Sequence, residues 1–431
     1  MVGLLFGLMI LFILLGMDIA IAMGAAVLAF LVFSGPGGVS APLLVIPQKM
    51  MNGLDSFPLL AVPLFLTAGQ LMNRGGVTER LVRFATALVG RLPAGLAYVS
   101  VLTNLIMSGL TGSAVADAAS TGSILIPAME RGKYSPRFAA AIIAAAAAIG
   151  PVFPPSILLV LVGASFSISI GRLFLGGVIP GVLMAVALAT AISLVTARSD
   201  LPRAAAATSW GEIAASARDA LLALVMPILI IGGILLGVVT PSEAGVLGVA
   251  YGLVLTMAIY GTLGVGDLAI VAKDAAVMTA AVMVTVATAS IVGWITTVSQ
   301  VGPTVSRALL GSHANPFMVR LLINLILLMA GFFLEPVPLV YLLLPVLLPI
   351  AKAISMDLIH LSIIFALNCS LGMIHPPIGL NILVVSTISR ASIWEVTKAI
   401  LPFFLALLVL LLIVTEVPQL VTWLPNLVMR E

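Results

Sequence analysis

An internal duplication constrains the fold of this chain more than any other feature. Residues 109–180 align without gaps on residues 331–402, at a constant offset of 222, the difference between 331 and 109. The aligned identities include glycines and prolines, which mark the positions where helices break. The clearest pair sets Gly150-Pro-Val-Phe-Pro-Pro155 against Gly372-Met-Ile-His-Pro-Pro377. Helices broken at matching places in two halves of a membrane protein point to a transport site.

The composition places both halves in a lipid bilayer. Of the 431 residues, 62% are hydrophobic and 8% are charged, whereas a soluble domain carries roughly 25% charged residues. We therefore expect an all-α polytopic membrane protein without a soluble domain. The net charge of +3 arises from Lys and Arg in short loops, which is not the pattern of a nucleic-acid-binding surface. A single cysteine, Cys369, excludes an internal disulfide and a cysteine-based metal site.

The predicted helices form two halves, residues 1–197 and 219–431, joined by a cytoplasmic loop at 198–218. In the first half we expect spans at about 3–15, 18–33, 55–73 and 172–197, and a broken helix at about 135–168. In the second half we expect spans at about 219–237, 242–261, 266–297 and 394–425, and a broken helix at about 358–389. Residues 76–90 and 301–312 are short and amphipathic, so they are expected to lie along the membrane surface; ordinary connecting loops are the alternative.

Residues 93–130 and 316–353 do not fit as single spans. Each is interrupted midway, at Ser108-Gly-Leu-Thr-Gly-Ser113 and at Gly331-Phe-Phe-Leu-Glu-Pro336. Each arm has about 15 to 18 residues, fewer than the about 20 that a crossing needs. We therefore expect two re-entrant helical hairpins whose irregular tips are buried in protein, because irregular backbone is not tolerated in contact with lipid.

Basic residues determine the expected sidedness. They flank the first hairpin, at Arg74, Arg80, Arg83 and Arg91 before it and at Arg131, Lys133 and Arg137 after it. Both ends of this hairpin are therefore expected in the cytoplasm, and the N-terminus outside. Each half then has about five crossing helices and one hairpin. Since five is odd, the second half is inverted and its hairpin enters from outside, although Arg320 and Lys352 lie at its base. Such inverted repeats are typical of secondary transporters.

Small, hydroxylated and acidic residues gather at the two hairpin tips. The first tip contains Ser108, Gly109, Thr111, Gly112 and Ser113, and the second contains Gly331 and Glu335. Carbonyl and hydroxyl oxygens suit a hard cation such as sodium, and the adjacent helix N-termini suit an anionic substrate. Close packing of helices through small residues is the alternative interpretation.

The two proline-interrupted loops supply further candidate ligands. Proline removes backbone donors, so carbonyls here lack helical partners and are available to an ion; the residues are Gly150, Val152, Pro154, Gly372, Ile374 and Pro376. A plain helix kink is the alternative. Polar side chains near the breaks are possible substrate or ion contacts: Asn104, Asp117, Asn368, His375 and Asn381. For His375, an ordinary hydrogen-bonded role is an equal alternative. No hydrolase, metalloprotease or nucleotide-binding motif occurs, so we do not expect an enzyme.

Seven segments together resemble the large membrane subunit of tripartite ATP-independent periplasmic (TRAP) transporters, the DctM-like permeases. They are spread over nearly the whole chain: Leu54-Asp-Ser-Phe-Pro58, Pro63-Leu-Phe65, Gly69-Gln-Leu-Met-Asn-Arg-Gly75, Gly112-Ser-Ala-Val-Ala-Asp-Ala118, Gly122-Ser-Ile-Leu-Ile-Pro-Ala-Met129, Ile149-Gly-Pro-Val-Phe-Pro-Pro-Ser156 and Pro376-Pro-Ile-Gly-Leu-Asn381. The chain departs from the family pattern at Thr111, Glu335 and His375, where Ser, Asp and Thr are usual.

The resemblance implies an elevator-type, sodium-coupled importer of organic anions, such as C4-dicarboxylates, other carboxylates or sialic acids. It implies sodium sites at the hairpin tips and Pro-Pro loops, with no other cofactor. It also implies two partners, a small four-helix membrane subunit and a periplasmic substrate-binding protein, and a place in the inner (cytoplasmic) membrane of a bacterium or archaeon. The alternative is a stand-alone sodium- or proton-coupled carboxylate or ion transporter. An intramembrane enzyme or assembly scaffold is a third hypothesis.

Overall fold

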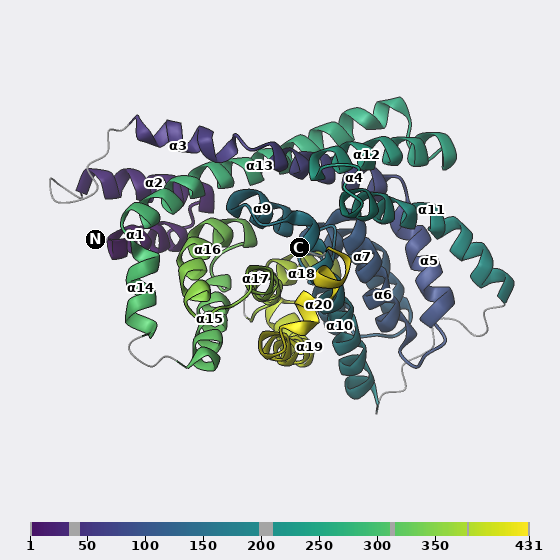
Figure 1. Ribbon diagram of the computed structural model, residues 1–431. Helices are drawn as coiled ribbons and strands as arrows, with labels where there is room; N and C mark the ends of the chain where they lie inside the picture. Colours follow the sequence, from purple (N-terminus) through teal and green to yellow (C-terminus); the bar gives the residue numbers. More distant parts are fainter. Residues whose placement is uncertain (1, 34–43, 198–209, 311–314, 377–378, 430–431) are drawn as a thin grey trace.

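The computed structural model describes residues 2–33, 44–197, 210–310, 315–376 and 379–429 (Figure 1). Its first half contains α1 (Val2–Leu14), α2 (Ile19–Phe33), α3 (Val45–Leu54), the 3-10 turn η1 (Phe57–Leu60), α4 (Ala61–Arg74), α5 (Val77–Val89), α6 (Gly95–Thr111), α7 (Ala114–Arg131), α8 (Pro136–Ala147), α9 (Ile157–Phe166) and α10 (Ile170–Thr196). Helices account for all the regular structure within these ranges, which confirms the all-α prediction.

The second half repeats this order. It contains α11 (Trp210–Leu235), α12 (Pro241–Leu253), the π-helical turn η2 (Val254–Ile259), α13 (Val265–Val298), α14 (Val301–Leu310), α15 (Pro316–Gly331), α16 (Pro336–Ala353), α17 (Leu358–Gly372), α18 (Leu380–Ser389), α19 (Ile393–Glu416) and α20 (Gln419–Val428). A shift of 222 residues carries α7 onto α16, and it carries α6, α8, α9 and α10 onto α15, α17, α18 and α19 to within a few residues.

The division into halves and their opposite orientation remain predictions. Residues 198–209 of the expected connecting loop, and residues 311–312 of the second amphipathic segment, lie outside the described residues. The helix α11 begins at Trp210, inside the range expected for the loop. The segments α5 and α14 precede the two hairpins, at the places where amphipathic helices were expected.

Six of the described helices are long and apolar enough to cross a membrane, and α3 with η1 and α4 makes a seventh if this bent pair is one span. That span begins at Val45 rather than near residue 55, and it bends by 65° between Leu54 and Phe57. The helices α8, α9, α17 and α18 have 12, 10, 15 and 10 residues. Each is too short to cross alone, because the proline-containing breaks fall between α8 and α9 and between α17 and α18.

The long helix α13 positions the elements around these breaks. It has 34 residues and runs along one side of the molecule, in contact with α2, α3, α4 and α16 (Figure 1). In the region of the breaks, α18 of the second half packs along α7 and α8 of the first. The breaks of the two halves are therefore brought together in one interior region.

Close packing of α10 on the first broken-helix loop predicts a strong effect of one glycine. A β-carbon at Gly177 would lie 2.2 Å from the carbonyl oxygen of Val152. We expect Gly177→Ala to lower the melting temperature in detergent, because this overlap costs about 1–3 kcal/mol. In Gly232→Ala, the added carbon meets no heavy atom within 4 Å, so this matched control is expected to melt at or above the wild-type temperature. Equal melting temperatures for the two variants would contradict the observed packing.

Candidate functional site

A cavity of about 370 Å³ lies where the broken elements of the two halves meet. We call it the tip cavity. Its walls come from the first hairpin tip (Gly112, Ser113, Ala114, Val115), the second tip (Glu335, Pro336, Val337), the broken helices (Pro151, Ile157, Leu158, Leu161, Met373, Leu380) and the helices α4 and α13 (Leu66, Met278, Ala281, Val282). Most of this lining is apolar, and the few polar groups come from the hairpin tips.

Four helices begin at the tip cavity. They are α7, α9, α16 and α18, whose first residues Ala114, Ile157, Pro336 and Leu380 all line it. The N-terminal end of a helix carries partial positive charge and unpaired N–H groups. The residues that precede α16 and α18, Glu335 and Gly379, provide no side-chain cap for these groups. No Lys, Arg or His is among the described lining residues, so the helix N-termini are the groups of this lining that could attract an anion.

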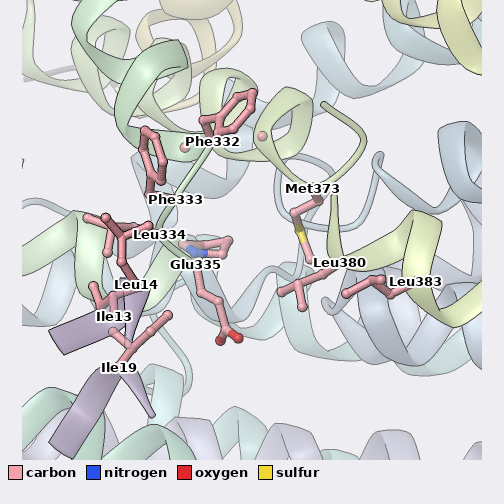
Figure 2. A pocket seen from close by; sticks show the side chains of 13 residues that line it. Ile13, Leu14, Ile19, Phe332, Phe333, Leu334, Glu335, Met373, Leu380 and Leu383 are labelled. Carbon is pink, nitrogen blue, oxygen red and sulfur yellow. The ribbon is translucent and has the colours of Figure 1, made fainter. Parts of the chain in front are cut away.

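Glu335 is the charged residue of the tip cavity. It also lines a neighbouring cavity of about 440 Å³, together with Ile13, Leu14 and Ile19 of the α1–α2 connection. Figure 2 shows its carboxylate directed away from Phe332 and Phe333, toward the space between Ile19 and Leu380. At this position the carboxylate would repel an anion in the tip cavity, and a cation between the two would offset that repulsion.

A buried cluster of oxygen atoms lies behind the first hairpin tip. The Asp117 side chain is fully buried. It accepts a hydrogen bond from the Thr111 hydroxyl, and the Ser108 hydroxyl lies 3.4 Å from its second oxygen. No basic residue pairs with Asp117 in the ion pairs of the described part of the chain. A buried carboxylate surrounded by hydroxyls fits a hard cation, whose ligands are oxygens.

The first broken-helix loop completes the surroundings of this cluster. Gly112 has a φ of 60°, and a β-carbon there would lie 2.6 Å from the Pro155 carbonyl. A β-carbon on Gly150 would lie 3.2 Å from the Asp117 carboxylate, and one on Gly109 would lie 3.5 Å from the Pro154 carbonyl. The glycines therefore allow the loop backbone to approach the hairpin tip. The Val152 carbonyl instead lies against Gly177 of α10.

The second tip and loop also meet through glycines. A β-carbon at Gly372 would lie 2.9 Å from the Gly331 carbonyl, and Ile374 is buried beside them. The half-buried His375 lies edge-on to Phe332 and Phe404, at centroid distances of 4.8 and 5.3 Å, and Nδ1 bonds to the Pro376 carbonyl. It is not among the residues that line the tip cavity. Pro377 lies outside the described residues.

The three predicted asparagines lie behind the cavity lining. Asn104 accepts a hydrogen bond of 3.2 Å from Thr121, within the first hairpin. The amide of Asn368 donates to Asn324 at 2.8 Å, and that of Asn381 donates to the Ala144 carbonyl at 3.0 Å, which connects α18 to α8. The side-chain oxygens of Asn368 and Asn381 are buried and have no hydrogen-bond partner in the described structure. They are therefore two further unsatisfied acceptors near the breaks.

The structure adds site residues that sequence reasoning missed. Leu66, Met278, Ala281 and Val282 form the α4 and α13 side of the tip cavity. Each is an apolar residue in an apolar helix, so no local pattern distinguishes it from a lipid-facing neighbour. The α1–α2 connection beside Glu335 was missed for the same reason.

The Thr111–Asp117 contact predicts a matched pair of variants. Thr111→Val removes the hydroxyl and leaves a fully buried carboxylate short of a donor, which costs about 1–3 kcal/mol. We expect a lower melting temperature for Thr111→Val, measured without added sodium, and a value near wild type for Thr111→Ser, which keeps the hydroxyl. Equal destabilisation by both variants would assign the effect to the lost methyl contact instead.

Comparison with known proteins identifies relatives of the whole chain. Residues 6–420 match the family described as the tripartite ATP-independent periplasmic transporter, DctM component. The chain is 39% identical to the Salmonella typhimurium protein YgiK, over 98% of this chain and 97% of that protein. It is 36% identical to the sialic acid TRAP transporter large permease protein SiaM of Vibrio cholerae, over 96% of this chain and 95% of that protein. It is 35% identical to the C4-dicarboxylate TRAP transporter large permease protein DctM of Vibrio cholerae, over 99% of this chain and 98% of that protein.

A solved structure shares the fold. The chain superposes on the crystal structure of the Alcanivorax borkumensis YdaH transporter with a TM-score of 0.63, covering 94% of this chain and 98% of that one. The two sequences are 16% identical, so the similarity concerns the fold. The arrangement of helices over nearly the whole chain is therefore that of a solved protein.

Proposed function

Because the chain belongs to the DctM component family of tripartite ATP-independent periplasmic transporters, we propose that it is the large membrane subunit of a sodium-coupled importer of organic anions. The observation that supports this most directly is the meeting of four helix N-termini at one cavity beside a buried oxygen cluster. The helix N-termini favour an anion, and the oxygen cluster favours a cation. The family is one of transporters, so we assign no enzymatic activity.

The proposed substrate is a small organic anion, in line with the relatives named for sialic acid and for C4-dicarboxylates. Its carboxylate would accept hydrogen bonds from N–H groups at the start of the four helices that begin at the tip cavity, such as that of Val337 in α16, whose neighbours Pro336 and Pro338 have no N–H. A periplasmic substrate-binding protein would deliver it, and a small four-helix membrane subunit would accompany this chain. The membrane is proposed to be the bacterial or archaeal inner membrane.

We assign one sodium ion to the oxygen cluster of Asp117, Thr111 and Ser108, with backbone carbonyls of the first tip and loop. A second would bind near Glu335, close to the backbone of Gly331 and Gly372. Sodium there would offset the carboxylates and strengthen anion binding in the tip cavity, since each ion lowers the repulsion felt by the other. This mutual effect is the coupling that a symporter requires.

The moving unit is proposed to consist of the two hairpins and the two broken helices, which would move past α4 and α13 by an elevator mechanism. The side of the tip cavity formed by α4 and α13 is apolar, with Leu66, Met278, Ala281 and Val282. Apolar contacts are non-directional, so sliding along this wall breaks no hydrogen bond with it.

Uptake by the reconstituted complex tests this function. The chain and its small subunit would be placed in liposomes, and uptake of labelled carboxylates and sialic acid would be measured with and without an inward sodium gradient and the binding protein. We expect uptake only when both are present. Uptake with sodium but without binding protein would support a stand-alone symporter instead. Uptake unaffected by replacing sodium with potassium would contradict the proposed coupling.

Sodium binding can be measured separately from transport. We expect sodium, but not potassium, to raise the melting temperature of the wild type by several degrees, because a ligand at 100 times its Kd stabilises by about 2.7 kcal/mol. Asp117→Asn is expected to reduce this shift by more than half. Glu130→Gln, at the exposed opposite end of the same helix, is the matched control and should keep it. If Asp117→Asn kept the full sodium-dependent rise in melting temperature, the ion would have to bind outside this cluster.

A further inference from the structure

We propose a second anion-binding site, in which Lys49 of α3 binds a carboxylate one or two helical turns from the tip cavity. The inference rests on the proposed function, because the anion is taken to be the substrate on its way to the tip cavity. Lys49 lies at the end of its span opposite Arg74. The basic residues around Arg74 predict that the Arg74 end of the span is cytoplasmic, so Lys49 is predicted to lie on the extracytoplasmic side.

The cavity that contains Lys49 has a volume of about 390 Å³. We call it the Lys49 cavity. Its polar lining includes Lys49, Asn52, Ser165, Ser290 and Tyr341, with Trp294 beside the lysine. Lys49 is the charged residue of this described lining, which contains no Asp or Glu. The cavity therefore has the opposite sign of charge to the Glu335 side of the tip cavity.

Packing of α3 on α13 holds Lys49 in place. A β-carbon at Gly53 would lie 2.1 Å from the Ser290 hydroxyl oxygen, so the two helices are in close contact there. One turn away on both helices, the Lys49 ammonium lies 5.8 Å from the centre of the Trp294 ring. None of the ion pairs between described residues includes Lys49. The ammonium therefore faces a cavity with its charge unpaired, held by an aromatic ring that leaves its N–H donors available.

Neighbouring groups supply the remaining donors that a carboxylate needs. The Ser165 hydroxyl donates to the Tyr341 phenol oxygen at 2.7 Å. The phenol accepts this bond and keeps its own O–H for another acceptor. The Asn52 amide is exposed on the same side. A cation with two neutral donors around a semi-enclosed space is suited to a carboxylate.

Three helices connect the Lys49 cavity to the tip cavity. On α9, Leu161 lines the tip cavity and Ser165 the Lys49 cavity; on α16 the corresponding residues are Val337 and Tyr341. On α13 they are Val282 and Ser290. At 1.5 Å per residue, the two linings are about 6 to 12 Å apart along these helices. An anion released from Lys49 would therefore reach the helix N-termini along a shared wall.

Quenching of Trp294 fluorescence tests the site without transport. The full chain, with Trp210, Trp394 and Trp423 replaced by Phe, would be placed in neutral phosphatidylcholine nanodiscs and titrated with bromosuccinate, a carboxylate that carries a heavy-atom quencher. We expect saturable quenching, and about a tenfold higher half-saturating concentration in Lys49→Met, as expected for loss of one charge-assisted hydrogen bond. Lys49→Arg should stay within about threefold, since it keeps the charge. Quenching by neutral bromoethanol should be equal in all variants.

Lys398→Met, made in the same single-tryptophan protein, is the matched control, because it removes a lysine that does not line the Lys49 cavity; its titration should equal that of the single-tryptophan protein with Lys49 intact. Identical curves for wild type and Lys49→Met would overturn the proposal. Saturable quenching that disappears when the nanodiscs contain phosphatidylglycerol would assign the site to a lipid phosphate group instead of the substrate. Quenching does not depend on uptake, so failure of the proposed transport function would be seen separately.

The uptake assay gives a second readout of the same variants. Lys49→Met is expected to raise the half-saturating substrate concentration about tenfold and to leave the maximal rate within twofold. A lower maximal rate at an unchanged half-saturating concentration would contradict a role in anion binding.

Discussion

The cost of unpaired backbone groups inside an apolar interior is the constraint on which the rest of this structure depends. Each break in a helix leaves N–H and C=O groups without partners, and lipid offers none. Here the breaks of both halves are gathered in one place, where hydroxyls, glycine-permitted backbone contacts and cavities surround them. Gly112 and Gly150 bring the first tip and loop together, and Gly331 and Gly372 do so for the second. The polar groups exposed by the breaks thereby become the lining of a site.

Groups of opposite charge lie close together in this interior. Four helix N-termini meet at the tip cavity, while Asp117 and Glu335 place carboxylates behind it and at its edge. The N-termini of α7 and α9 are capped by the Ser113 and Ser156 side chains, and Asp117 lies in the first turn of α7, whereas α16 and α18 have no side-chain cap. In the proposed function, a cation beside these carboxylates would lower the repulsion that they exert on an anion at the helix ends. A cavity with a single lysine on the neighbouring turns extends this pattern toward the predicted outer side.

Much of this could be predicted from the sequence, because glycine and proline determine backbone breaks locally. The hairpin tips, the two interrupted helices and the contact of Ser108 and Thr111 with Asp117 all follow from residues close together in the chain. Residues that act through tertiary packing could not be predicted. Nothing near His375 indicates that Phe332 and Phe404 enclose it, and nothing near Lys49 indicates that Trp294 lies beside it. The bend at Leu54 also concealed that its span begins at Val45.

The duplicated halves correspond in sequence order, and two corresponding helices make corresponding contacts of different extent. The helix α18 packs extensively along α7 and α8 of the first half, and its counterpart α9 contacts the corresponding helices α16 and α17 of the second half less extensively. If the two halves are inverted repeats, equal packing on both sides would place the site midway and open to neither face. Unequal packing is what one end state of an alternating-access cycle requires, and exchange of the two arrangements between halves would generate the other. The Lys49 cavity lies beside α9, the helix of this pair that packs less extensively on the opposite half.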